Sequence, residues 1–220
     1  MTWKELLPLF GQGTLETLYM TLGSALIAYG IGLPVGFWLA ATDPGGICPS
    51  PAVNRIAGGI VNLLRSVPFL ILLVALKPFT RLVTGTSIGS AAMIVPLIVS
   101  GAPYIARMVE SSAKEVDRGV IEASLAMGAS PLQVILKVIL PESKPSLIVG
   151  AAISVTTILG YSAMAGIVGG GGLGGIAINY GYYRTQTGIM LAMIVLLILL
   201  VQILQEVGDS IARRSDKRIR

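Results

Sequence analysis

The 220-residue sequence contains no histidine and only one cysteine, Cys48. These two absences exclude a zinc cluster built from Cys and His, a disulfide framework and a redox cysteine pair within one chain. Charged residues are also scarce, at 12% of the sequence, which is about half of the fraction usual in soluble domains. Because 54% of the residues are hydrophobic and the mean hydropathy is +0.81, the composition predicts an integral membrane protein.

The N-terminal segment lacks the pattern of a signal peptide. The acidic residue Glu5 comes early, Pro8 interrupts the short apolar stretch, and no small-residue cleavage site follows. We expect an interfacial segment here, with Trp3 and Phe10 as its anchors.

Five stretches are apolar and long enough to cross the hydrocarbon core of a membrane, which takes about 20 residues as a helix. They cover residues 18–41, 56–76, 88–106, 147–168 and 188–205. Prolines recur inside these stretches, at Pro34, Pro68, Pro96 and Pro103. In a membrane helix, proline is tolerated where neighbouring helices satisfy the freed backbone groups. The sequence therefore predicts an all-α membrane protein in which residues 1–220 form a single transmembrane domain.

Lysine and arginine are distributed unevenly around the five predicted spans. Of the 16 basic residues, eleven fall on one side of the membrane: Arg55, Arg107, Lys114, Arg118, Lys137, Lys144, Arg213, Arg214, Lys217, Arg218 and Arg220. Because the side richer in Lys and Arg is cytoplasmic, we expect the loop 107–146 and the C-terminus inside and the N-terminus outside. The net charge of +5 is then a topology signal, and we expect membrane lipid but no nucleic acid as a partner.

The cytoplasmic loop has its own helical periodicity. A first short helix is predicted from Asp117 to Met127, because Gly128 suits a left-handed helix end. A second is predicted to begin after Ser130, with Pro131 at the first helical position and Gln133 completing a capping box. Its apolar residues, Leu132, Ile135, Leu136 and Ile139, follow helical spacing, and Pro141 is expected to end it. Two interpretations fit this pattern: a lid lying on the membrane, or a knob that docks a partner.

The spacing of residues in this loop resembles a known motif. Glu122-Ala123-Ser124 is followed by Gly128 and, nine residues later, by a stretch that ends in Leu140-Pro141. This pattern is similar to the EAA loop of the membrane subunits of ABC importers, with serine in place of the second alanine. The resemblance implies a type I ABC importer permease whose loop contains the coupling helix that docks on an ATPase subunit. It assigns ATPase coupling to Glu122, Ala123, Ser124, Gly128, Leu140 and Pro141.

Further stretches resemble the permeases of methionine importers. They are residues 65–70, 78–81, 85–89, 102–110, 160–164 and 169–175, with Tyr180-Gly181-Tyr182 beyond them. The resemblance implies a five-helix permease of the bacterial cytoplasmic membrane that forms a homodimer. It also implies two copies of a separate ATPase and a periplasmic or lipid-anchored methionine-binding protein as partners. This chain would bind no cofactor or metal and hold no catalytic residue, because ATP and Mg belong to the ATPase.

A few residues are candidates for the translocation pathway. Tyr161, Ser162 and Met164 give the fourth span mixed polarity, although they would equally pack between helices. Arg65 is the one ionisable residue inside a predicted span, where charges are costly and often functional. It lines the pathway or extends toward the cytoplasmic face. The glycine-rich run 169–175 lacks the Gly-Lys-Ser/Thr ending of a phosphate-binding loop, and we expect a flexible outer loop that touches the binding protein or caps the fourth helix.

Other classes of membrane protein fit less well. An intramembrane serine protease needs a histidine, and an aspartyl protease needs two aspartates within its spans, which the sequence lacks. Proton-coupled secondary transporters usually need an ionisable acidic group or histidine in the membrane, and an ion channel has no need of a docking loop. The closest alternative is an ABC permease for an osmoprotectant or another amino acid.

Overall fold

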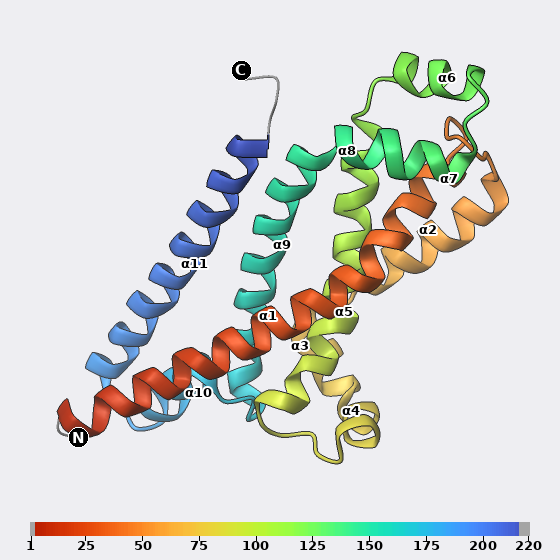
Figure 1. Cartoon of the computed structure of the whole chain (residues 1–220). Coiled ribbons are helices and arrows are strands. Elements are labelled where there is room, and N and C mark those ends of the chain that lie inside the picture. The colour runs from red at the N-terminus through yellow and green to blue at the C-terminus, as the bar shows by residue number, and fades with distance from the viewer. Residues whose placement is uncertain (1–2, 216–220) are drawn as a thin grey trace. The chain divides into compact units, whose positions relative to one another are not determined.

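The chain folds into helices joined by short connections in a computed structural model, which describes the backbone of residues 3–215 and the side chains of residues 6–215 (Figure 1). The long helices are α1 (Trp3–Thr42), α2 (Pro51–Ser66), α5 (Ser90–Lys114), α9 (Lys144–Ala165) and α11 (Thr187–Ser215). The short α-helices are α3 (Phe69–Ala75), α4 (Lys77–Thr84), α6 (Arg118–Ala126), α7 (Pro131–Val134), α8 (Leu140–Glu142) and α10 (Gly172–Ile176). Two π-helical segments, η1 (Ile135–Ile139) and η3 (Ala177–Tyr182), and one 3₁₀ turn, η2 (Gly166–Val168), complete the fold. No strand occurs within residues 3–215, so the predicted all-α fold is confirmed.

Four helical segments are long and apolar enough to cross a membrane: Leu6–Thr42, Ser90–Lys114, Lys144–Tyr182 and Thr187–Ser215. A fifth candidate is the pair α2 and α3, which together pass the same test although the pair is bent. These segments match the five predicted spans: three predicted spans lie wholly within them, while the predicted 56–76 ends one residue past α3 and the predicted 88–106 begins two residues before α5. Most of the segments extend beyond the predicted ends. The extension is expected, because a helix can continue past the apolar core into polar surroundings.

The second predicted span, 56–76, is not one continuous helix. α2 ends at Ser66 and α3 begins at Phe69, so the break falls at Val67-Pro68. Proline lacks the amide hydrogen that a helix interior needs, and it disfavours helical geometry in the residue before it. Pro68 accordingly has an extended backbone, with ψ at 132°.

The predicted interfacial segment at the N-terminus is not separate from the first span. A single helix, α1, runs from Trp3 to Thr42 and includes Pro8. Pro8 is the sixth residue of this helix, so it removes one backbone hydrogen bond from the second turn without ending the helix. The Trp3 side chain and the basic residues Lys217, Arg218 and Arg220 lie outside the described residues.

The chain divides into two compact units, each assembled from three separate stretches. The first unit takes Met1–Ile27, Val67–Gly101 and Ser154–Gln205, and the second takes Ala28–Ser66, Ala102–Ile153 and Glu206–Arg220. Four long helices, α1, α5, α9 and α11, contribute residues to both units. That residues 1–220 act as one permease domain stays a prediction.

In the first unit, the glycine-rich run packs against the beginning of α1. Leu173 and Ile176 of α10 are buried in a core cluster together with Met193 of α11. The Glu16 carboxylate accepts a hydrogen bond from the Gly172 backbone amide at 2.7 Å, and the Thr17 hydroxyl accepts one from the Leu173 amide at 2.9 Å. These two side chains satisfy amides at the start of α10 that have no partner within the helix.

The prediction of a loop over residues 169–175 is therefore wrong for residues 172–175, which belong to α10, while residues 169–171 are non-helical and Gly169 caps the turn η2 that follows α9, with φ at +88°. Gly172, Gly174 and Gly175 are buried within α10, and the carbonyl oxygen of exposed Gly169 accepts a hydrogen bond from the Gly89 amide. A side chain on Gly172 would meet the Thr17 hydroxyl at 2.7 Å. The small glycine residues of this run therefore allow close packing of α10 against its neighbours.

In the second unit, α1 packs closely on α5 through two glycines. A Cβ atom on Gly32 would lie 2.7 Å from Ile105, and one on Gly36 would lie 2.5 Å from the Ala106 carbonyl oxygen. Gly32 and Gly36 are four residues apart, so they form one small-residue stripe of the kind that lets membrane helices approach. Beside it, a core cluster joins Leu39, Val61 and Ala106.

Candidate coupling site and translocation residues

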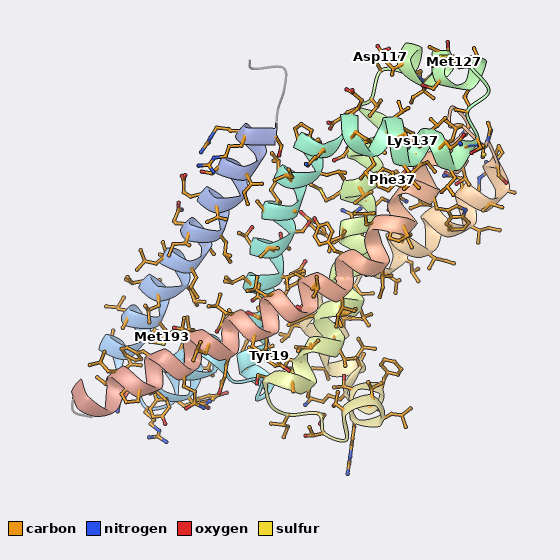
Figure 2. The ribbon with its side chains drawn as sticks, in the orientation of Figure 1. Tyr19, Phe37, Asp117, Met127, Lys137 and Met193 are labelled. Atoms are coloured by element: carbon orange, nitrogen blue, oxygen red, sulfur yellow. The ribbon has the colours of Figure 1, made fainter. Side chains whose placement is uncertain are left out.

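The first helix of the loop, α6, follows the predicted boundaries closely. The Asp117 carboxylate accepts hydrogen bonds from the Gly119 amide at 2.8 Å and the Val120 amide at 3.3 Å, and thereby caps the helix. Helix α6 ends with Met127 at its C-cap, and Figure 2 labels both ends. The three residues of the motif lie in the middle of this helix: Glu122 and Ala123 are exposed, while Ser124 is buried.

Gly128 makes the sharp break between the two short helices. Its φ angle is +83°, which belongs to the left-handed region where residues other than glycine are strained. No atom lies within 4 Å of a Cβ placed on this glycine. The requirement for glycine is therefore set by the backbone and not by space.

The second helix begins as predicted. The Ser130 hydroxyl accepts from the Gln133 amide, the Gln133 side chain accepts from the Ser130 amide at 2.9 Å, and Pro131 occupies the first turn. The helical path then passes through the π-helical segment η1 and continues to Glu142. The helical path ends one residue after Pro141, which was expected to end it, and the π turn lies shortly before this end. Turns of this kind are often found where a helix ladder is interrupted.

The π turn also changes which apolar side chains of the second helix are buried. Val134 and Ile139 are buried, whereas Leu132 and Leu136, predicted on the same face as Ile139, are 64% and 53% exposed. Met127 at the tip of α6 is 82% exposed. Exposed apolar side chains gathered on a small element are typical of a docking surface.

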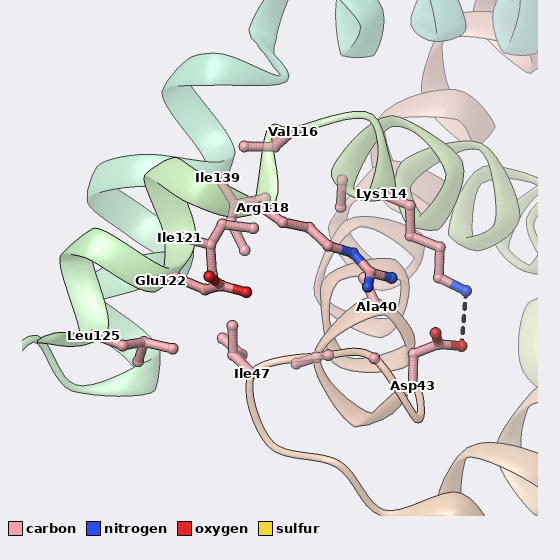
Figure 3. A pocket seen from close by; sticks show the side chains of 14 residues that line it. Ala40, Asp43, Ile47, Lys114, Val116, Arg118, Ile121, Glu122, Leu125 and Ile139 are labelled. Carbon is pink, nitrogen blue, oxygen red and sulfur yellow. Dashed lines mark hydrogen bonds and ion pairs between the residues drawn. The ribbon is translucent and has the colours of Figure 1, made fainter.

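A cavity of about 240 Å³ lies between α6 and the turn that follows α1 (Figure 3). It is lined by Ala40, Ala41, Asp43, Gly45, Gly46, Ile47, Ala113, Lys114, Val116, Arg118, Ile121, Glu122, Leu125 and Ile139. Ile47 from the turn faces Ile121 and Leu125 from α6 across this space. The remaining motif residues stand at the end of the segment, where Leu140 is half-buried and Pro141 is exposed.

Asp43 and Lys114 in the wall of this cavity belong to a charge network that extends beyond it. The Glu110 carboxylate accepts from Arg107 at 2.6 Å and from Lys114 at 2.8 Å. Lys114 also donates to Asp43 at 2.9 Å, and Arg107 donates to the Gly58 carbonyl oxygen at 2.7 Å. The spacings of three and four residues along α5 are those of paired helix charges and were readable in the sequence. The link to Asp43 was not, because 71 residues separate it from Lys114.

The charge network lowers the pKa of the Asp43 carboxyl. The hydrogen bond from Lys114 holds the pKa of Asp43 below its usual value of 3.8, and the nearby positive charges of Lys114 and Arg118 act in the same direction. Partial burial works against this lowering. Asp43 is therefore ionised, and its link to Lys114 is a charge pair, throughout the physiological pH range.

The predicted translocation residues take different environments. In the first unit, Tyr161 stacks on Phe69 with ring centroids 4.6 Å apart. Ser162 is buried, donates to the Leu159 carbonyl oxygen at 2.8 Å and accepts from Thr21 at 3.4 Å. Tyr161 and Ser162 thus pack within the unit, whereas Met164 is 47% exposed.

Arg65 belongs to the second unit. It is exposed at the end of α2, with its guanidinium carbon 5.8 Å from the centre of the Tyr104 ring. That distance is within the range of a cation–π contact. The three predicted residues of the fourth span belong to the first unit.

No group of three His, Cys, Asp or Glu side chains that could hold a metal ion occurs in the part of the chain that the structure describes. What the residues offer is a surface for docking together with a set of charges that join helices. The two short helices of the loop, residues 117–142, form a knob on the protein. A helical chain with several membrane-spanning segments and such a knob is of the class of transporter membrane subunits. Residues 32–220 match the family described as "Binding-protein-dependent transport system inner membrane component", and the chain belongs to that family.

Named relatives place the chain more narrowly within this family. It is 47% identical over 205 residues to the probable D-methionine transport system permease protein MetI of Vibrio cholerae, covering 93% of this chain and 91% of the relative. It is 52% identical over 155 residues to the D-methionine transport system permease protein MetI of Escherichia coli K12, covering 70% of this chain and 71% of that one. A solved structure of the MetNI methionine ABC transporter in inward-facing conformations matches with a TM-score of 0.96 and 48% identity, over 99% of this chain and 100% of that one.

These comparisons confirm the resemblance to methionine-import permeases and the fold of a type I importer permease. The chain is an inner-membrane permease subunit with several apolar helices. The individual roles assigned to the six coupling residues and the four translocation residues stay predictions.

Proposed function

We propose that this chain is the permease subunit of an ATP-binding-cassette importer that carries methionine across the cytoplasmic membrane. The observation that carries the proposal is the knob: a capped α6, a break at Gly128 with φ +83°, and a second capped helix, with exposed Met127, Leu132 and Leu136. Such a surface needs a partner, because water disfavours exposed apolar side chains. The partner is the ATPase subunit, which binds ATP and Mg.

The permease is a homodimer in this proposal, with two ATPase subunits on the cytoplasmic side and a periplasmic or lipid-anchored methionine-binding protein on the other. The C-terminus and the knob are cytoplasmic and the N-terminus is outside, as the excess of Lys and Arg beside the knob favours. ATP binding and hydrolysis then shift the populations of two access states of the permease.

The uncharged fourth and fifth spans support a neutral cargo. Residues 147–168 and 188–205 contain no Asp, Glu, Lys or Arg. A permanently charged substrate would therefore find no counter-ion there, whereas zwitterionic methionine, with an apolar side chain, needs none. The pathway assignments of Arg65, Tyr161, Ser162 and Met164 belong to this proposal.

Gly128→Val tests the coupling role of the knob. Valine at φ +83° is strained by about 1–2 kcal/mol or more, so the two helices lose their relative arrangement although space for the side chain exists. We expect membrane insertion to persist, while ATPase co-purification and methionine uptake are lost. Glu122→Arg, which reverses an exposed charge on α6, should have the same effect without altering the backbone.

The matched control is Gly11→Val. Gly11 also has no atom within 4 Å of an added Cβ, and its φ is not positive. This variant should keep both ATPase binding and uptake. Unchanged co-purification and unchanged uptake in Gly128→Val and Glu122→Arg would refute the coupling assignment.

A further inference from the structure

We propose that Glu110 is a positioning residue for energy coupling: through Lys114 it holds the turn after α1 against the coupling helix α6. The inference rests on the proposed function, since it concerns how ATPase movement at α6 reaches the helices of the permease. The turn covers residues 43–50 and is called the α1–α2 turn below.

Glu110 is the centre of the network because of its burial. It is only 5% exposed, yet its carboxylate contacts two cationic side chains. A buried charge is tolerated when it is paired and fully hydrogen-bonded, and losing the pairing is costly. Both carboxylate oxygens are used: Oε2 accepts from Arg107 and Oε1 accepts from Lys114.

The two cations extend the network to other elements. Lys114 reaches Asp43 at the start of the α1–α2 turn, and Arg107 reaches the backbone of α2 at Gly58. A Cβ atom on Gly58 would lie 3.1 Å from the Arg107 guanidinium, so the small residue admits this contact. Glu110 therefore ties the last two turns of α5 to α2 and to the α1–α2 turn.

The α1–α2 turn also contacts the coupling helix α6. Arg118, the first residue of α6, lies so close to Gly45 that a Cβ there would be 2.8 Å from its guanidinium nitrogen. Ile47 faces Ile121 across the shared cavity (Figure 3). The short covalent link of residues 115–117 also joins α5 to α6. A pull on α6 can therefore reach α5 through the α1–α2 turn and its ion pair with Lys114, and Glu110 holds the Lys114 side chain in place for that pair.

This arrangement makes a prediction that a purely structural ion pair does not make. If Glu110 only stabilised the fold, its loss would lower the amount of assembled complex and leave the number of methionine molecules moved per ATP unchanged. If it positions the turn, the assembled complex hydrolyses ATP without moving cargo efficiently. The ratio of uptake to ATP hydrolysis separates the two roles.

The experiment compares the wild type with Glu110→Gln and the control Glu115→Gln in the full complex with its ATPase and binding protein, reconstituted in liposomes. Glu115 is an exposed carboxylate near the same end of α5 and takes no part in the ion pairs of the described residues. A nitroxide on Cys48, the only cysteine of the chain and an exposed residue of the turn, reports the mobility of the turn without further engineering.

We expect Glu110→Gln to reduce methionine moved per ATP by about tenfold and to raise the mobility of the Cys48 label, while Glu115→Gln matches the wild type in both. An unchanged ratio or an unchanged label spectrum in assembled Glu110→Gln would overturn the proposal. If this variant does not assemble, Asp43→Asn replaces it, because that change cuts only the outermost link. It should raise the label mobility and reduce the ratio by about threefold, and wild-type values would overturn the proposal equally.

Failure of the proposed function would give a different set of results from failure of the Glu110 proposal. A wild-type complex that hydrolyses ATP but moves no methionine contradicts the cargo assignment. The label on Cys48 still decides whether Glu110 holds the turn, because that spectrum requires no methionine.

Discussion

Two carboxylates, Glu16 and Glu110, each fix a segment that is distant in the sequence. In the first unit, Glu16 holds the amide of Gly172 at the start of the glycine-rich helix. In the second unit, Glu110 holds Lys114, which in turn holds Asp43. The contacts of Glu16 with Gly172 and of Lys114 with Asp43 do not follow from local pattern, because folding brings these chain segments together. The pair of Glu110 and Lys114 does, because the two residues are four apart on one helix. At this scale the sequence identified which residues carry charge, but not which atoms those charges bind.

The lowered pKa of Asp43 leads to a prediction about acid. Because the pKa in the folded protein lies below the usual value of 3.8, the charge pair with Lys114 contributes fully above that value and is lost only as the pH falls through the lowered pKa. We expect the mobility of a Cys48 nitroxide to stay constant between about pH 8 and about pH 5. It should rise only in stronger acid, and Asp43→Asn should remove that transition. A rise between pH 7 and pH 5 would show that another group controls the turn.

At the scale of elements, local signals predicted more than long-range ones. The boundaries of α6 and the start of α7 were predictable because Asp117, Gly128 and Ser130 act on neighbouring backbone groups. The break at Pro68 was underestimated, because apolar composition on both sides of it suggested a single span. The π turn at 135–139 was not predicted at all, and Leu132 and Leu136 are exposed although they were predicted on one face with buried Ile139. Helical periodicity assumes a constant number of residues per turn, which this segment does not keep.

The packing of α1 on α5 gives a second prediction at this scale. In Gly36→Val, the added side chain would meet Ala106 and Val109 of α5, with Cβ 2.5 Å from the Val109 Cβ. Overpacking of this kind costs about 1–3 kcal/mol. We expect the apparent Tm of the purified permease to fall by several degrees. Gly30→Val is the control in the same helix, since no atom lies within 4 Å of a Cβ there; equal Tm values for the two variants would contradict the close contact.

For the whole molecule, the helices are apolar and much of their surface is exposed, most of all along α11. Such surfaces are stable in lipid or against other subunits, which agrees with an inner-membrane permease. Composition and charge distribution were sufficient to predict this class, because they sum over many residues. The six-residue coupling motif narrowed the class to ABC importers by its spacing. The cargo depended on similarity spread along the chain, since the chemistry of the spans alone indicates only a neutral solute.

The central claim is that this permease moves methionine when coupled to a separate ATPase. The most direct test is uptake of labelled methionine in a transport-deficient bacterial strain that expresses the chain with its ATPase and binding protein. The account predicts uptake that requires all three components, that disappears in Gly128→Val and that excess unlabelled methionine suppresses. An assembled complex that hydrolyses ATP yet accumulates no methionine would contradict it.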